Sequence, residues 1–522
     1  MPDSAALSGT IDNASPVSED LMTIARGAGI NFVGHLSAIV LIFALNLLLA
    51  RALGPQGTGV IGIALSVTSI ALVLAMFGLQ TGVVRFVAFY VGQDDQARAT
   101  GAILAGARIV IALSLAVAAV LLIATDLLAE RVFEMPNLTP VLHIFAVSLP
   151  FLAVTQFFLS VTQGLKRMEY RAIIERMVVP GLKIAGLYVV LYLIGRSAVG
   201  VAYAFLVAAV LGAILAVVSV AKVYPIHIAK GRAIFVTRAM IAFSWPLLMM
   251  DTINQFWLET GILVLGAFAA ADQVGIYYVG LRATALITLF MTGFSTIFAP
   301  IMAELHAQQN NKRLNSLLKT VTRWGFSLCV PFFLILFIFS KEILQAFGPG
   351  FERGSVVLKI LAVSQLVNVA TGPSGWLLTM SGHTRLNLLN SALMLGLSLG
   401  LAFLLIPRFG IVGAAVGAGV STILVKILRL LEVHILFRIH PFSLSYMKPV
   451  AAGLLSLLAV SSLHFLNPDL PPVTQLTVFA PLTILLYVMV LLILKLDKHD
   501  WVVVHEIHRQ FRRFSSTRAV RR

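Results

Sequence analysis

Long apolar stretches of about 20 residues follow one another along the chain, separated by short polar connections. A bilayer core of about 30 Å is crossed by roughly 20 apolar residues in helical form. The pattern therefore predicts an all-α integral membrane protein with about fourteen transmembrane helices. The expected spans are 28–50, 58–80, 100–124, 138–162, 171–194, 198–221, 240–264, 274–300, 318–340, 356–380, 386–406, 411–436, 447–466 and 474–495.

The composition supports this prediction. Hydrophobic residues make up 59% of the 522 positions and charged residues only 11%, whereas soluble proteins have about 25% charged residues. The spans follow one another too closely to leave a soluble domain of ordinary size between them. The single cysteine, Cys329, lies in an apolar run. It is expected to be a small core residue, and it excludes an internal disulfide and a thiolate metal cluster.

The basic residues predict the orientation. The formal charge is +16, which in a soluble protein would raise nucleic acid as a partner. If the N-terminus is cytoplasmic, 28 of the 38 Lys and Arg residues are assigned to the cytoplasmic side and 7 to the other, with residues in the ends of spans counted with the adjoining connections. The remaining 3 (Arg108, Lys183 and Arg282) are assigned to the interior of spans. This excess follows the positive-inside rule. It predicts that both termini are cytoplasmic, and it removes the argument for nucleic acid.

Sequence landmarks recur at a nearly constant distance. Gly59 and Gly275, each in a short loop before a span, have the same separation along the chain as Gln93 and Gln309. Two further pairs, Gly164 with Gly382 and Gly200 with Gly413, have nearly the same separation. This separation, the repeat offset, covers six spans, an even number, so the repeats run in the same direction. Parallel repeats are typical of two-lobed transporters with a site near the bilayer midplane.

The repeat and the spans together predict the domain organisation. The expected parts are a mobile cytoplasmic N-terminal tail (1–27), an N-lobe of helices 1–6 (28–222), a cytoplasmic linker between the lobes (223–239), a C-lobe of helices 7–12 (240–438), an appended pair of helices 13–14 (439–495) and a basic cytoplasmic tail (496–522). The stretch up to about Asp20 is polar and acidic and lacks a basic segment and a small-residue cleavage site, so no cleaved signal peptide is expected.

Three motifs resemble a known family. Leu49–Gly59 and Gly78–Phe86 are similar to the first-loop and second-span signatures of bacterial polysaccharide transporters, and Leu265–Tyr277 is similar to their second-lobe partner. These transporters belong to the multidrug/oligosaccharidyl-lipid/polysaccharide exporter superfamily. The resemblance covers about residues 25–440, and the appended pair matches the fourteen-span members.

The resemblance implies a function. It implies a multi-pass flippase of the bacterial inner membrane for an undecaprenyl-diphosphate-linked oligosaccharide, in O-antigen, capsule or exopolysaccharide synthesis. Alternating access of the two lobes would move this substrate to the periplasmic leaflet. The implied partners are the lipid-linked oligosaccharide, membrane lipids, a polysaccharide polymerase and glycosyltransferases.

Four cationic residues are candidates for holding the diphosphate or acidic sugars, because ionisable groups inside a membrane are costly. They are Arg282, Lys183, Arg85 and Arg108. For Arg282 the alternative is an ion pair with Asp251 or Glu259 inside one lobe. Lys183 and Arg108 could instead extend to the headgroups, and Arg85 could anchor to headgroups.

Uncharged and acidic polar residues form two helical faces. Asn31 and His35 lie one turn apart in the first span, and Asp251, Gln255 and Glu259 follow an i, i+4, i+8 series in the seventh. Two interpretations stay open. These faces could line a cavity between the lobes, or they could form hydrogen bonds between helices, which also hold membrane helices together.

No motif of an enzyme appears. The sequence lacks a nucleophile elbow, a phosphate-binding GKS loop, metal-ligand spacing and a dinucleotide fingerprint, so neither catalysis nor a cofactor is expected. H⁺ and Na⁺ are equal candidates for a coupling ion. The alternatives are a cation-coupled multidrug exporter, which would bind cations through Asp251 and Glu259, a lipid II flippase, and a membrane scaffold or glycosyl-transfer enzyme.

Overall fold

A computed structural model describes residues 16–193, 195–224, 233–466 and 470–494. Side chains are described from Ser37 onward, except at several positions between 289 and 300. The chain divides into two compact units. Unit 1 comprises residues 1–283, 347–357 and 385–421, and unit 2 comprises residues 284–346, 358–384 and 422–522. The predicted division into lobes and an appended pair stays a prediction.

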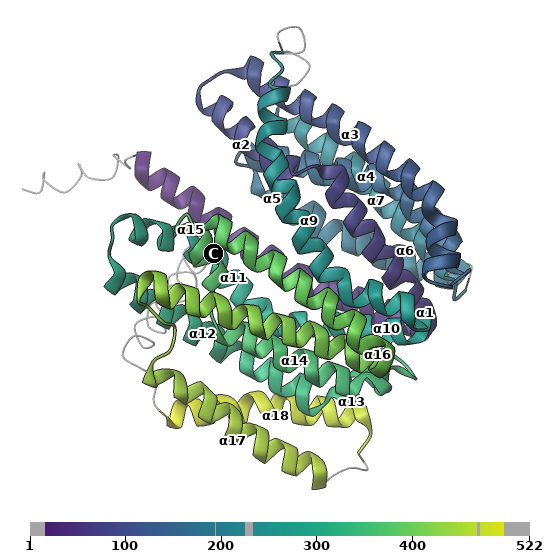
Figure 1. Cartoon of the computed structure of the whole chain (residues 1–522), viewed down its shortest axis with the longest axis vertical. Coiled ribbons are helices and arrows are strands. Elements are labelled where there is room, and N and C mark those ends of the chain that lie inside the picture. Colours follow the sequence, from purple (N-terminus) through teal and green to yellow (C-terminus); the bar gives the residue numbers. More distant parts are fainter. Residues whose placement is uncertain (1–15, 194, 225–232, 467–469, 495–522) are drawn as a thin grey trace, which may run out of the picture. The chain divides into compact units, whose positions relative to one another are not determined.

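The described part of unit 1 consists of helices joined by short turns and connections. Helices α3, α4 and α7 pack along one another, as Figure 1 shows. The helices of this unit are α1 (Pro16–Met76), α2 (Leu79–Gly92), α3 (Gln96–Asp126), α4 (Leu138–Gly164), α5 (Met168–Ile173), α6 (Val179–Leu193), α7 (Ala198–Val223), α9 (Thr237–Phe268) and α10 (Ala271–Ala283), with π-helical turns at Leu127–Val132 and Ile174–Val178 and a 3-10 turn at Phe351–Gly354.

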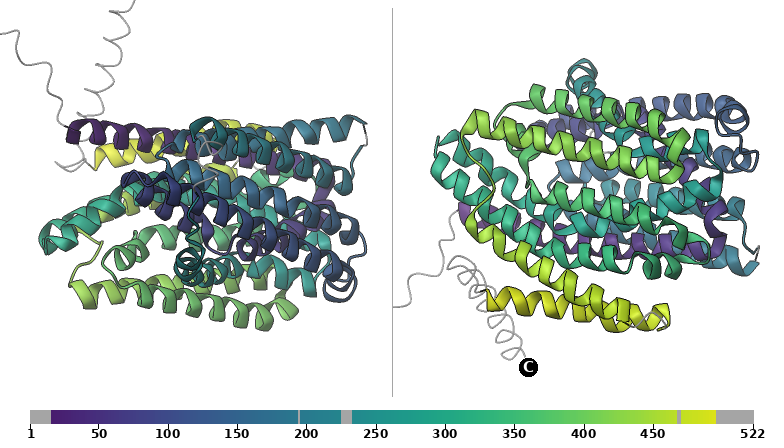
Figure 2. Two further views of the ribbon diagram at one scale, coloured as in Figure 1. Left: turned by 90° about the horizontal axis from the view of Figure 1, so that it is seen from above. Right: turned by 60° about the horizontal axis from the view of Figure 1, so that its bottom comes forward.

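Unit 2 contains the remaining helices. Its last two, α17 and α18, pack against each other, as the right view of Figure 2 shows, and also contact α12. The helices are α11 (Ala285–Ala307), α12 (Asn311–Ile338), α13 (Ser340–Phe347), α14 (Ser355–Ala370), α15 (Ser374–Met380), α17 (Met447–Leu466) and α18 (Pro472–Ile493), with a 3-10 turn at Leu444–Tyr446. Most of α16 (Thr384–Phe437) belongs to unit 1, and its end belongs to unit 2.

Ten helices in the described chain are long and apolar enough to cross a membrane, which makes this a multi-pass membrane protein. Two of them are more than one crossing long, because α16 alone would extend on the order of 80 Å if straight. The chain bends at Gly54 in α1 and at Gly410 in α16, both with positive φ. Beyond Gly410 the helix folds back, so that Gly413 lies against the carbonyl of Leu405. Fourteen crossings and cytoplasmic termini stay predictions.

Several predicted segment boundaries coincide with the ends of helices, and others differ from them. The predicted tail at 1–27 overlaps α1, which begins at Pro16, a residue whose fixed φ suits a first helical position. The second predicted span is interrupted at Phe77 and Gly78, both with positive φ. The linker at 223–239 leads into α9 at Thr237, with residues 225–232 outside the described chain. The basic tail at 496–522 also lies outside it.

The start of α3 has the same local geometry as the start of α12. Asp95 caps α3 by accepting a hydrogen bond from the Arg98 amide, and Asn310 caps α12 by accepting from the Arg313 amide. In both cases the preceding residue has a left-handed backbone. The separation of the two caps falls one position short of the repeat offset, so the local structure agrees with the repeat seen in the sequence.

Gly59 and Gly275, which are related by the repeat offset, lie in contact inside unit 1. A Cβ atom at Gly59 would overlap the carbonyl oxygen of Ala271, and one at Gly275 would overlap that of Pro55. Pro55 and Ala271 are themselves separated by the repeat offset, so the crossing is symmetric. Such close backbone contact requires small residues on both helices. Helices α1 and α10 therefore cross in backbone contact within unit 1 (Figure 1).

Candidate functional site

The polar face of α9 packs against α1 and α2. The carboxylate of Asp251, half-buried, accepts a hydrogen bond of 2.9 Å from the side-chain amide of Gln80 in α2. One turn further along, the amide of Gln255 donates to the hydroxyl of Ser69 in α1 at 2.9 Å. The predicted face exists, and its members form hydrogen bonds between helices. Its role in lining a cavity stays a prediction.

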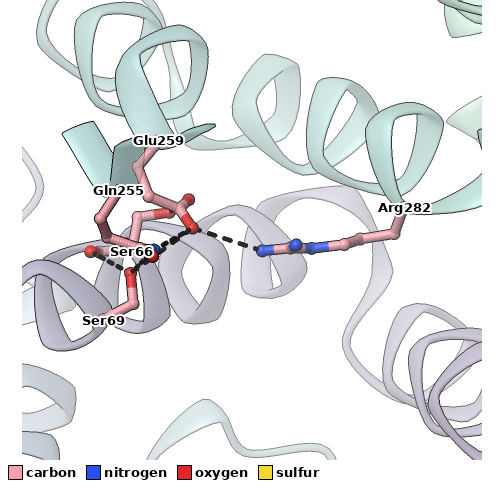
Figure 3. Close-up of polar contacts among 5 residues, drawn as sticks. All are labelled: Ser66, Ser69, Gln255, Glu259 and Arg282. Carbon is pink, nitrogen blue, oxygen red and sulfur yellow. Dashed lines mark hydrogen bonds and ion pairs between the residues drawn. The ribbon is translucent and has the colours of Figure 1, made fainter. Parts of the chain in front are cut away.

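Glu259 is the most buried member of that face, and α1 supplies its main partner. Its Oε2 accepts a hydrogen bond of 2.7 Å from the hydroxyl of Ser66. Its Oε1 accepts from Gln255 at 3.2 Å and lies 3.4 Å from the hydroxyl of Ser69. Figure 3 shows these side chains gathered around the carboxylate. An ionised carboxylate in such a setting requires this degree of hydrogen bonding to offset its lost hydration.

Arg282 approaches the same carboxylate from α10. Its Nη2 lies 3.8 Å from Oε1 of Glu259, and the Arg282 side chain is 38% exposed whereas that of Glu259 is 5% exposed. The guanidinium carbon also lies 5.0 Å from the ring centroid of Tyr278, within cation–π range. The ion pair that the sequence left as an alternative for Arg282 is therefore present, with Glu259 as the partner.

Arg85 and Arg108 lie near the beginning of α9. Arg85 of α2 sits 4.2 Å from the ring centroid of Phe243, and Arg108 of α3 sits 4.9 Å from that of Phe235. Both side chains are exposed, and within the described chain neither forms an ion pair. Phe243 precedes Glu259 by sixteen residues, roughly 24 Å along the helix. The structure thus places these two cations apart from Arg282.

Lys183 is held elsewhere in unit 1. Its ammonium, on α6, lies 4.7 Å from the ring centroid of Phe205 on α7. Phe205 is buried, so the lysine stem runs along an apolar contact between two helices. No described contact links Lys183 to the Glu259 cluster, and its part in binding stays a prediction.

Asn31 and His35 lie in α1, but their side chains are outside the described part of the structure. The sequence predictions did not include Ser66, Ser69 and Gln80, which hold the acidic residues of α9. The repeat offset contains a signal for one of them, because Ser66 is the repeat equivalent of Arg282. Both residues contact Glu259, from α1 and α10 respectively.

Comparison with known proteins gives a family match and two curated relatives. A family described as "Polysaccharide biosynthesis protein" matches residues 48–348, more than half of the chain. The "Probable low-salt glycan biosynthesis flippase Agl15" of Haloferax volcanii is 30% identical over 169 residues, 32% of this chain and 35% of that protein. The "Probable flippase AglR" of the same organism is 26% identical over 227 residues, 41% and 44%. The match spans less than half the length of either relative.

Solved structures show the fold. The lipid II flippase MurJ in an inward closed conformation superposes with a TM-score of 0.70 at 14% identity, covering 88% of this chain and 96% of that one. An inward-facing multidrug resistance transporter of the MATE family, in the MOP superfamily, gives a TM-score of 0.66 at 14% identity, covering 78% and 98%. At such low identity these likenesses establish the fold alone. The chain belongs to the polysaccharide biosynthesis protein family and has the fold of the MOP superfamily.

Proposed function

We propose that this protein is a flippase for a lipid-linked oligosaccharide carried on an isoprenoid diphosphate. The observation that carries the proposal is the partly exposed side chain of Arg282 beside a buried carboxylate that other groups already hold. Guanidinium groups bind phosphate oxygens through two parallel hydrogen bonds. The family match and the naming of both curated relatives as probable flippases support the same class of substrate.

The two exposed arginines of α2 and α3 that lie near the beginning of α9 also fit this proposal. Arg85 and Arg108 are oriented by aromatic rings rather than by acids, so each can receive an anion without first losing a carboxylate partner. They would attract the diphosphate at the entrance, and Arg282 would hold it deeper in unit 1. Lys183 would bind acidic sugars.

A cation-coupled multidrug exporter is the second candidate. It would require Asp251 and Glu259 to bind cations. Glu259 already has Arg282 within 3.8 Å, and a fixed positive charge at this distance opposes the binding of a second cation. The ion pair therefore favours an anionic substrate.

The cellular setting follows from the proposed substrate. The protein would lie in the bacterial cytoplasmic membrane with both termini inside, as the basic residues predict. Glycosyltransferases would supply the oligosaccharide on the inner leaflet, and a polysaccharide polymerase would consume it for O-antigen, capsule or exopolysaccharide. The isoprenoid tail would stay in the bilayer while the lobes alternate in access.

Replacing Arg282 by alanine should lower the rate of flipping at least tenfold. Purified protein in liposomes would be given a fluorescent oligosaccharide on an isoprenoid diphosphate, and exposure of the sugar to a membrane-impermeant glycosidase would be followed. Arg167→Ala is the matched control, because Arg167 lies in a connection and pairs with Glu169 at the surface. Equal rates for Arg282→Ala and the control, with equal amounts of inserted protein, would contradict the assignment of Arg282.

A further inference from the structure

The junction between α1 and α2 is fixed against the first half of α9. Phe77 and Gly78 both have positive φ, so the chain turns sharply there. A Cβ atom at Gly78 would lie 2.6 Å from the carbonyl oxygen of Ser244 and 3.0 Å from the amide nitrogen of Leu248. These are backbone atoms of α9, and only glycine allows so close an approach. The contact therefore sets where the side chains before and after Gly78 can reach along α9.

After Gly78, the side chains of Gln80 and Asp251 meet with much of their hydrogen-bonding capacity unused. The carboxylate of Asp251 accepts one hydrogen bond, of 2.9 Å, from the amide nitrogen of Gln80, and within the described chain it forms no other hydrogen bond or ion pair. A carboxylate has about four acceptor sites, and a carboxamide has a second N–H and a carbonyl oxygen. Both side chains are partly exposed. The pair can therefore bind neighbouring hydroxyl groups, the pattern that a sugar ring offers.

Before Gly78, an aromatic pair lies against the same part of α9. The rings of Phe77 and Trp245 have centroids 5.8 Å apart and planes tilted by 43°. Trp245 is 53% exposed, so much of its indole stays accessible. The indole N–H is a donor, and no residue of the described chain accepts from it. Such a side chain offers an apolar face for the C–H groups of a sugar and a polar edge for one of its hydroxyl groups.

Helix α9 sets the distance of these groups from Arg282. Arg282 pairs with Glu259, and Asp251 precedes Glu259 by eight residues, roughly 12 Å along the helix. Trp245 lies about 9 Å further towards the beginning of α9. A substrate whose diphosphate is held by Arg282 would thus have a sugar, rather than a phosphate, beside Asp251. A carboxylate repels a sugar that is itself an anion, so this position favours a neutral one.

We propose that Gln80, Asp251 and Trp245 form a subsite for a neutral sugar of the lipid-linked oligosaccharide. Asp251 and Gln80 bind neighbouring hydroxyl groups of the ring, and Trp245, supported by Phe77, packs against its C–H face. No covalent bond changes. A uronic acid in the same place is rejected by the charge of Asp251. This inference rests on the proposed function, and it assigns to these residues a part of the substrate that Arg282 does not bind.

The test uses the full-length protein in detergent and three probes. They are farnesyl diphosphate, farnesyl diphosphate carrying a disaccharide of N-acetylglucosamine and glucose, and the same compound with glucuronic acid in place of glucose. Titration calorimetry gives a Kd for each probe. For the native protein we expect the neutral disaccharide to bind about tenfold more tightly than either of the other two, because a site built to bind hydroxyl groups discriminates against ligands that lack them or place a charge there.

Asp251→Asn keeps the shape of the side chain and removes its charge. It should reduce the preference for the neutral over the acidic disaccharide to within about twofold. Asp126→Asn is the matched control, because Asp126 is exposed at the end of α3, and it should keep the full preference. Trp245→Ala should lose most of the affinity that the sugar adds, and Trp245→Phe should keep most of it. Each result is a ratio between probes for one variant, so a smaller amount of folded protein does not change it.

The outcomes separate this inference from the proposed function. Equal affinity of the native protein for the three probes, or an unchanged preference in Asp251→Asn, would overturn the sugar subsite and leave the flippase proposal standing. A Trp245→Ala protein that kept the full gain from the sugar would remove the indole from the subsite. Arg282→Ala should weaken the binding of all three probes. If the native protein bound none of them, the proposed function would fail and the subsite with it.

Discussion

Gly275→Ala is expected to destabilise the protein by about 1–3 kcal/mol, as overpacking of a tight contact does, and to stop transport. The added methyl group would overlap the carbonyl oxygen of Pro55 and lie 2.9 Å from the amide nitrogen of Gly59. Both are backbone atoms of α1, which cannot rotate away as a side chain can. The variant must therefore separate α1 from α10 or distort both helices.

Gly396→Ala is the matched control for this prediction. Gly396 lies within α16 and has no atom within 4 Å of the position that a methyl group would take. Alanine also favours a helix over glycine by about 1 kcal/mol. Thermal unfolding of the detergent-solubilised variants would be followed together with the flipping assay. A Gly275→Ala protein as stable and active as Gly396→Ala would show that the crossing tolerates separation.

Much of the helical layout could be predicted from the sequence, because apolar stretches of membrane length have a clear signature. Helix α4 begins at the predicted residue, Leu138, and α7 begins at the predicted Ala198. Interruptions within a span were harder to predict. The tenth expected span is broken between Ala370 and Ser374, where Gly372 has a left-handed backbone and Pro373 follows it. The average hydropathy of a window does not register such a break.

The polar face of α9 was predictable because its period is that of a helix. The partners on α1 and α2 were not, since Ser66, Ser69 and Gln80 lie in apolar surroundings and carry no charge. Buried serines often bond to their own helix backbone, so hydropathy and charge do not distinguish Ser66, which reaches Glu259; only its position one repeat offset before Arg282 does.

Two arginines counted among the cytoplasmic connections are in fact buried in helices. Arg323 lies within α12 and Arg429 within α16. Both positions lie within expected spans, 318–340 and 411–436, but the count assigned them to the adjoining connections. The excess of basic residues on one side is large enough to survive their removal from the count.

A disulfide between α1 and α10 should block transport reversibly. Gly62 and Tyr278 are separated by the repeat offset and face each other within unit 1. A Cβ atom at Gly62 would lie 3.5 Å from the Cβ of Tyr278, within the 3.5–4.5 Å usual for disulfides. The double variant Gly62→Cys and Tyr278→Cys, in a Cys329→Ala background, should therefore cross-link on oxidation without moving the helices far. Cys329 is buried and is the only native cysteine.

The loss of transport is expected because the cross-link joins the two predicted lobes. Alternating access requires the lobes to part first at one end and then at the other, and a covalent bond across α1 and α10 prevents one of these steps. We expect at least a tenfold loss of flipping after oxidation and its return after reduction. The reduced double variant is the better control than either single variant, because Gly62→Cys alone would meet the Tyr278 ring at about 3.0 Å. Retained transport in a fully cross-linked sample would mean that α1 and α10 move as one body, and the motion would then have to be assigned to other helices.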